Sequence, residues 1–322
     1  MSIITKANTT ALVPEDATRE ILKSVPQQSQ VLALATRLAN MSAGQRRIPV
    51  MSAMPQAYFV EGVPSAAPNN TVGFKKTTKA AWDNVYITAE EIACIVPIPI
   101  SVLEDAAYDI WAEIRPYIAQ AFGIVIDDAI LNGTDKPASW ADGIVTQAKA
   151  AGHEIERGAT GAELYQALLG ETGVINMVEN TGSLPNAVLA STKMRGVIRG
   201  AVDTQGQPLF RATAQESQPY VIDGLPVHFD ETKVLTDLAV VGDWSKLVYA
   251  IRTDMTYKVL TEAIIQDLAT SEIIYNLAQQ DMVALRCYMR MGWALPNPVN
   301  IAGNGVPFAV LTPVAEEASG GE

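Results

Sequence analysis

The sequence predicts an α+β fold that combines one long helix, long strands and extended segments. Residues 280–293 alternate between apolar and polar side chains, as a half-buried strand does. Residues 110–131 carry apolar side chains at helical spacing. Residues 61–82 are polar and rich in turn formers, which are concentrated at 61–70. Alternating runs come after residue 70, at 72–79 and 82–90, which predicts a long, protruding hairpin loop.

The composition allows a large core and leaves apolar surface over. The chain has 322 residues, of which 48% are hydrophobic and only 18% are charged. Such a chain is near the size at which one core divides into two domains. Burial of the remaining apolar surface against copies of the same chain is one interpretation, and a large internal core is the other.

The charge balance argues against direct binding of nucleic acid. The net charge is -12, and the basic pairs are limited to Arg46-Arg47 and Lys75-Lys76. Proteins that bind DNA directly usually carry a basic face. If DNA is a partner, we expect it to be enclosed without sequence-specific contacts.

The two cysteines, Cys94 and Cys287, each lie among apolar residues and far apart in the chain. Two isolated buried thiols fit a reducing cytoplasm better than a disulfide framework. The first residues lack the pattern of a signal peptide, and no apolar stretch of about 18 residues predicts a membrane span.

In the first half of the chain, residues 1–30 predict an extended arm with one short helix from Pro14 to Lys23. Residues 31–35 suit either a strand or a helix, and 47–51 and 58–60 predict strands. Pro97 and Pro99 predict an edge strand or an extended segment at 92–103, and not a central strand, since proline cannot donate to a ladder. Within the helix of residues 110–131, Pro116 predicts either a kink or a fresh start, and Gly133 a stop.

In the second half, residues 134–160 predict a loop. Thr160 and Glu163 match a capping box, which begins one helix with Leu164, Leu168, Leu169, Ile175 and Val178 on its buried side. A helix is predicted from Thr192 to Val202, with Ser191 as its cap, and a loop at 203–220. Strands are predicted at 186–190, 220–222, 227–229, 239–241 and 247–252.

Six fragments, in order, resemble the Hong Kong 97-type family of tailed-phage major capsid proteins. They are Ala57–Gly62, Ile100–Ala106, Ile126–Gly133, Asp142–Ile144, Val241–Lys246 and Asp281–Trp293. The resemblance implies an N-terminal arm and first strands (1–55), an extended loop (56–92) and a peripheral domain with the spine helix (93–159 and 236–311). It also implies an axial domain (160–235) and a flexible tail (312–322).

The resemblance further implies a coat protein whose pentamers and hexamers form an icosahedral shell around double-stranded DNA. Such a protein is part of the virion, assembles in the host cytoplasm, and has scaffold, portal and decoration proteins as further partners. Some members cross-link Lys to Asn between subunits, and Lys75, Lys76 and Lys79 lie in the corresponding loop. Lysines on a solvated loop are common, and this is the interpretation that we prefer to a cross-link.

Contacts between subunits are therefore the functional site to look for. The candidates are Arg19, Lys23, Glu61, Lys75, Lys76, Lys79, Arg286 and Arg290. The two arginines share one strand face, where carboxylates of a neighbouring subunit or solvent suit them equally well.

No catalytic residue, metal site or cofactor is predicted. Each histidine, His153 and His228, suits a surface or packing role better than general-base catalysis, because no nucleophile lies nearby in sequence. Asp127 and Asp128 point about 100° apart on a helix and so do not converge, and an exposed helix face is the interpretation we adopt. The alternatives are a nanocompartment shell of the same fold, a soluble α+β enzyme, and a tail component.

Overall fold

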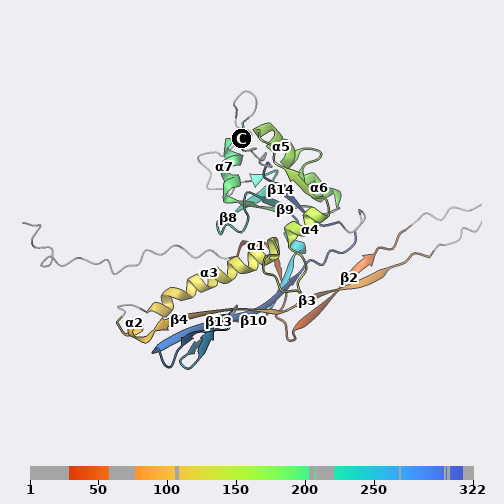
Figure 1. The fold of residues 1–322 in the computed structure, drawn as a ribbon. Helices are drawn as coiled ribbons and strands as arrows, with labels where there is room; N and C mark the ends of the chain where they lie inside the picture. The colour runs from red at the N-terminus through yellow and green to blue at the C-terminus, as the bar shows by residue number, and fades with distance from the viewer. Residues whose placement is uncertain are drawn as a thin grey trace, which may run out of the picture.

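The computed structural model describes residues 29–57, 77–105, 109–202, 207, 221–267, 270–300, 302 and 305–314. Several predicted features lie outside these residues. They are the arm helix at 14–23, the strand at 58–60, the part of the extended loop between 58 and 76, and most of the loop at 203–220. Figure 1 shows an elongated body that carries α3, a more compact unit above it, and a two-stranded ribbon that leads away.

The helices are α1 (Gln30–Leu34), α2 (Ile100–Asp105), α3 (Ile110–Leu131), α4 (Ile144–Ala150), α5 (Gly161–Leu169), α6 (Val174–Asn180) and α7 (Thr192–Gly200), with a 3-10 turn η2 (Trp244–Lys246). The strands are β1 (Thr36–Arg37), β2 (Gln45–Ala53), β3 (Ala81–Thr88), β4 (Glu90–Pro99), β5 (Glu154–Glu156), β6 (Ala187–Ser191), β7 (Val221–Ile222), β8 (Leu225–Asp230), β9 (Ala239–Gly242), β10 (Val248–Leu260), β11 (Ile264–Gln266), β12 (Ile273–Asn276), β13 (Met282–Ala294) and β14 (Phe308–Thr312).

The elongated body is a four-stranded sheet in the order β1-β10-β13-β4, with α3 over one face. β13 confirms the predicted alternation: Leu285, Cys287, Met289, Met291 and Trp293 belong to the core, and Arg286, Tyr288 and Arg290 point the other way. β4 lies at the edge of this sheet, as its prolines predict.

The spine helix α3 is continuous through Pro116. Asp109 caps its start by accepting hydrogen bonds from the backbone N–H groups of Trp111 and Ala112. The alternative of a fresh start at Pro116 is wrong, because α3 begins six residues earlier, at Ile110. Gly133 ends the helix as predicted: it has φ +75°, and its N–H donates to the carbonyl of Asp128.

The second unit is a six-stranded sheet in the order β5-β14-β9-β6-β8-β7. Every residue of β6, β9 and β14 is buried. One face packs with α5, α6 and α7 in a separate cluster. The other face contributes Leu189, Val240 and Phe308 to the cluster that also holds α3 and β13. One core therefore joins the two sheets.

Two predictions in this region are wrong. Residues 134–160 are not only a loop, because they contain α4 and β5, and Ile144, Val145 and Ala148 are buried. The single helix after Thr160 is two helices, α5 and α6, with Gly170 as the cap that ends the first. The capping box itself is confirmed: the backbone N–H of Thr160 donates to Glu163 Oε2 (2.9 Å), and the N–H of Glu163 donates to Thr160 Oγ1 (3.3 Å).

The helix after β6 is confirmed in place but shorter than predicted, since α7 ends at Gly200. Ser191 precedes it without a side-chain cap hydrogen bond. The predicted axial domain, residues 160–235, contains only part of the six-stranded sheet. Three strands of that sheet, β5, β9 and β14, lie outside this range.

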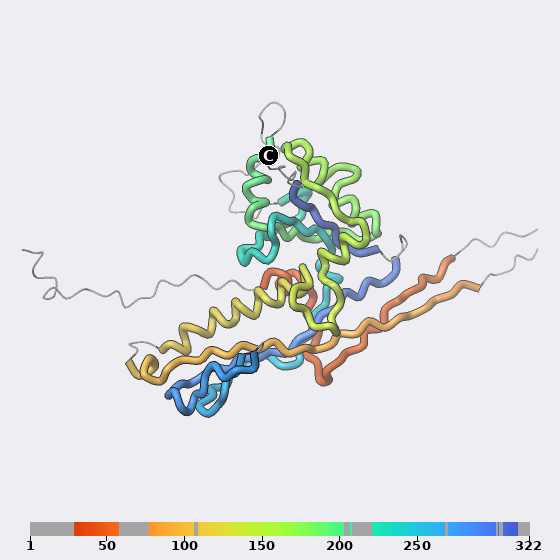
Figure 2. The backbone as a smooth tube through the Cα atoms, viewed as in Figure 1, coloured from red at the N-terminus to blue at the C-terminus, as the bar shows by residue number. Residues whose placement is uncertain are grey.

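The ribbon pairs β2 with β3 antiparallel, from Gln45 opposite Thr88 to Ala53 opposite Ala81. Figure 2 shows its two strands running side by side away from the body. The strand predicted at 47–51 is confirmed as part of β2, so the ribbon begins before the predicted loop boundary at residue 56.

Candidate functional site

Only three of the eight candidate contact residues lie in the part of the chain that the structure describes. Arg19, Lys23, Glu61, Lys75 and Lys76 lie outside it. Lys79 is exposed just before β3. Arg286 and Arg290 are on β13, far from Lys79 in the chain, and the structure shows partners for both.

Both arginines pair with Glu91 of the same chain. Glu91 lies directly opposite Arg290 in the β4–β13 ladder. Arg290 donates to Glu91 Oε2 from Nε (2.7 Å) and from Nη2, and Arg286 Nη2 lies 3.5 Å from Oε1. The hydrogen bond from Arg290 is the main cause that lowers the pKa of Glu91. One carboxylate therefore serves two guanidinium groups.

A third cation lies on the same sheet face. Lys258 of β10 is directly opposite Arg286 of β13. Like charges at directly opposed positions repel each other. Within the described residues no ion pair involves Lys258. Around Glu91, this face therefore brings three cations, Lys258, Arg286 and Arg290, against the one carboxylate of Glu91. Sequence reasoning missed Lys258, because only the β10–β13 register places it beside Arg286.

The ribbon has one exposed face with two aromatic side chains. Trp82 is 65% exposed and Tyr86 is 51% exposed. They lie opposite Met51 and Arg47, so these four residues share one face. The other face is better covered, with Ile87 fully buried. A hairpin between β10 and β13 also exposes apolar side chains, those of Ile264, Ile273 and Ile274.

Asp127 is buried, so the prediction that it lies on an exposed helix face is wrong. Its side chain accepts hydrogen bonds from Ser29 Oγ (2.5 Å) and from the backbone N–H of Gln30 (3.0 Å). Ser29 also caps α1 by accepting from the N–H of Leu32 (3.0 Å). Asp127 thus ties α3 to the first described residues after the arm.

Burial raises the pKa of Asp127 to about 7, although the hydrogen bonds from Ser29 and Gln30 oppose the shift. The negative charge of Asp230 adds to the increase. Asp128 instead accepts hydrogen bonds from Asn132 and Thr134. The two aspartates therefore have separate partners, as their helical spacing predicts.

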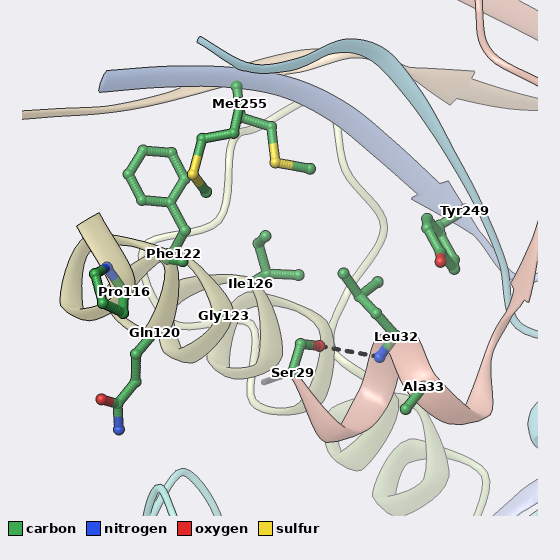
Figure 3. A pocket seen from close by; sticks show the side chains of 12 residues that line it. Ser29, Leu32, Ala33, Pro116, Gln120, Phe122, Gly123, Ile126, Tyr249 and Met255 are labelled. Atoms are coloured by element: carbon green, nitrogen blue, oxygen red, sulfur yellow. Dashed lines mark hydrogen bonds between the residues drawn. The ribbon is translucent and has the colours of Figure 1, made fainter. Parts of the chain in front are cut away.

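A cavity of about 610 Å³ lies between α1, α3 and the four-stranded sheet. Figure 3 shows Phe122, Ile126, Leu32 and Met255 around it. Its lining is mostly apolar, and no acidic, basic or histidine side chain is among the residues that form it.

Both histidines lie in or next to strands of the six-stranded sheet. His153 Nδ1 lies 3.1 Å from the carbonyl oxygen of Phe308, and His228 lies within β8. No group of three or more His, Cys, Asp or Glu side chains that could hold a metal ion occurs among the described residues. None of the helices in the described ranges is long and apolar enough to cross a membrane.

Comparison with known proteins gives concordant results. The model of the phage capsid family matches residues 9–302. The major capsid protein of Staphylococcus phage 80alpha is 25% identical over 284 residues, which cover 85% of this chain and 78% of that protein. A solved chain from Mycobacterium phage Adephagia has a TM-score of 0.81 at 29% identity, covering 97% of this chain and 98% of that one.

A solved chain from Microbacterium phage Oxtober96 has a TM-score of 0.79 at 30% identity, covering 97% of this chain and 100% of that one. The similarity therefore extends over both sheets, the spine helix and the ribbon.

Proposed function

The chain belongs to the phage capsid family and is a major capsid protein of the tailed-phage type, and from this premise we propose how its copies assemble. Pentamers and hexamers of the chain build a closed icosahedral shell that encloses double-stranded DNA. The family is structural, and we propose that the chain catalyses no reaction.

The observation that carries this proposal is the β2–β3 ribbon. A two-stranded ribbon is marginally stable alone in water. This one also leaves Trp82 and Tyr86 largely exposed, and large aromatic side chains are typical anchors of protein interfaces. A neighbouring copy that covers this face would stabilise the ribbon and remove the two aromatic side chains from water. Repeated around a closed, symmetric assembly, many modest contacts of this kind sum to a stable shell.

The basic sheet face supplies a second contact. Glu91 compensates Arg290 most directly, which leaves Arg286 and Lys258 close together with excess positive charge. We propose that a carboxylate of a neighbouring subunit lies against these two residues. The proposed contacts of the arm and loop with neighbouring subunits are Arg19, Lys23, Glu61, Lys75, Lys76 and Lys79. An isopeptide cross-link through a loop lysine is a further proposal.

The setting follows from the family and the charge. The protein is a component of the virion, and we propose that it assembles in the host cytoplasm with scaffold, portal and decoration proteins. The net charge of -12 supports enclosure of DNA without sequence-specific contacts, since a strongly basic lumen would bind the genome too tightly. We also propose that the chain divides into a peripheral and an axial domain, and that the six-stranded sheet forms the axial domain.

Electron microscopy and light scattering test the proposal on the purified chain, with and without the proteins encoded beside it. Closed particles or ring-shaped capsomers are expected. A chain that stays a monomer or dimer even with its scaffold protein would overturn it. Nuclease-resistant DNA inside the particles separates a virus shell from a nanocompartment, which would contain protein.

A further inference from the structure

The β4–β13 ladder brings the two cysteines of the chain together. Cys94 lies directly opposite Cys287, between the pairs Ile92–Met289 and Val96–Leu285. Directly opposed residues of an antiparallel pair point to the same face of the sheet. For this pair the face is the one that packs beneath α3, since Cys287 belongs to that core and Cys94 packs against it.

The register also gives a suitable distance for a covalent bond. Opposed residues in antiparallel strands have Cα atoms about 4.5 or 5.5 Å apart, depending on whether the pair is hydrogen-bonded. Disulfides usually join Cα atoms about 4.4–6.8 Å apart. Either kind of pair lies within this range, so a bond needs side-chain rotation and little backbone movement.

We propose that Cys94 and Cys287 form a reversible cross-strand disulfide that links β4 to β13 when the protein meets a small-molecule disulfide such as oxidised glutathione. The thiolate of Cys94 attacks one sulfur of that disulfide, forms a mixed disulfide and releases the first glutathione thiolate. The thiolate of Cys287 then attacks the sulfur of Cys94 and releases the second. Two protein thiols are oxidised, one glutathione disulfide is reduced, and the two protons pass to the released thiolates.

The environment of the two sulfurs sets this order. Cys94 is partly exposed at the sheet edge, whereas Cys287 is fully buried. Burial, with a smaller contribution from Cys94, raises the pKa of Cys287 to about 11. Since the thiolate is the nucleophile, Cys287 reacts slowly with any dissolved reagent and acts only on the adjacent mixed disulfide.

The bond would act on the edge of the sheet. β4 is held to the body through its ladder with β13, and the cross-link joins residues far apart in sequence, which constrains the unfolded chain. The reducing cytoplasm keeps the thiols free during assembly, and an oxidising medium closes the bond afterwards. Only this timing rests on the proposed function; the chemistry can be tested on the isolated chain.

The test incubates the folded, full-length chain with oxidised glutathione and then counts free thiols after unfolding. We expect both thiols to disappear, the Cys94 and Cys287 peptides to be found linked by mass spectrometry, and the chain to migrate as a monomer on a non-reducing gel. The melting temperature should rise by about 5 °C and return when dithiothreitol is added.

Two alanine variants separate the roles of the sulfurs. Cys287→Ala should stop at the mixed disulfide with one glutathione bound to Cys94. Cys94→Ala should leave Cys287 unmodified while folded and reactive once unfolded. If either variant fails to fold, the linked peptide in the wild-type chain still decides the matter. Two free thiols after prolonged exposure, or a disulfide between chains, would overturn the proposal whether or not shells form.

Discussion

The six-stranded sheet and the β2–β3 ribbon meet the same physical requirement in opposite ways. All residues of β6, β9 and β14 are buried, with apolar clusters on both faces of their sheet. The ribbon has two strands and one covered face, and Trp82 on its other face is 65% exposed. The sheet completes its burial within one chain, and the ribbon does not.

This difference separates two classes of residue. Substitutions in the six-stranded sheet should lower the stability of the isolated chain, because the lost contacts are internal. Substitutions on the exposed ribbon face should leave that stability unchanged and weaken assembly. Substitutions at Asp127 and at the Glu91 ion pairs should also change the stability of the isolated chain, because these contacts are internal, but their effect depends on charge.

The largest effect on folding is expected for Phe308→Ala. Phe308 is fully buried and packs edge-on against Trp244, with ring centroids 5.1 Å apart. Removal of such a ring costs about 3–5 kcal/mol, measured as the free energy of unfolding in urea. The matched control is Leu184→Ala, which removes a side chain that is 76% exposed and should change stability by less than about 0.5 kcal/mol. Similar losses in both variants would contradict a closed core.

The next effect is the pH dependence that Asp127 introduces. The folded chain keeps the proton of Asp127 up to about pH 7, whereas the unfolded chain releases it near the ordinary value of 3.8. Stability is therefore highest at low pH for this group and falls as pH rises from about 4 to 7, by on the order of 3 kcal/mol.

Asp127→Asn removes this titration. The wild-type chain should lose stability between pH 5 and 7.5, and the variant should lose distinctly less over the same range in urea titrations. Other carboxylates contribute equally to both chains, so the difference between the two curves reports Asp127. Parallel curves would show that Asp127 is already ionised at pH 5.

A change on the ribbon should act on assembly alone. Trp82→Ala should alter the unfolding free energy of the isolated chain by less than about 0.5 kcal/mol, because the ring is mostly exposed. We expect the critical concentration for particle formation to rise about tenfold, as for loss of an interface contact worth about 1.4 kcal/mol. Leu184→Ala is again the control. Normal assembly of the Trp82 variant would show that this face is not covered in the shell.

The smallest effect is expected at Glu91. Arg290→Ala removes an exposed ion pair and should cost at most about 1 kcal/mol of folding stability. The pKa of Glu91, followed by NMR, should rise more in Arg290→Ala than in Arg286→Ala, because the hydrogen bond from Arg290 is the main cause of its lowering. Equal shifts in the two variants would contradict this geometry.

Features with a local cause could be predicted from the sequence. The alternation of β13 follows from the two-residue period of a strand. The capping box of Thr160 and Glu163 needs only residues three apart. Pro97 and Pro99 restrict β4 to a sheet edge, since proline lacks the N–H that a central strand must donate. The order of the six fragments from Ala57–Gly62 to Asp281–Trp293 was enough to indicate the family.

Contacts between distant parts of the chain were decided by the tertiary structure. Asp127 is buried because Ser29 and Gln30, which lie 98 and 97 residues earlier in the chain, pack against α3. Helical spacing says which way its side chain points and nothing about what covers it. In the same way, β5, β9 and β14 are joined in one sheet from three separate stretches.

The sequence by itself therefore determined the long helix, the long strand β13 and the capping box, since propensities, caps and hydrophobic periods act over a few residues, and the order of the six fragments indicated the family. It missed α4 and β5 and joined α5 to α6. Only the tertiary structure decided the register between strands, which places Cys94 opposite Cys287, Lys258 opposite Arg286 and Arg290 opposite Glu91. A shift of register by one residue leaves the composition of each strand unchanged and turns its side chains to the other face. These pairs therefore depend on how the whole chain packs.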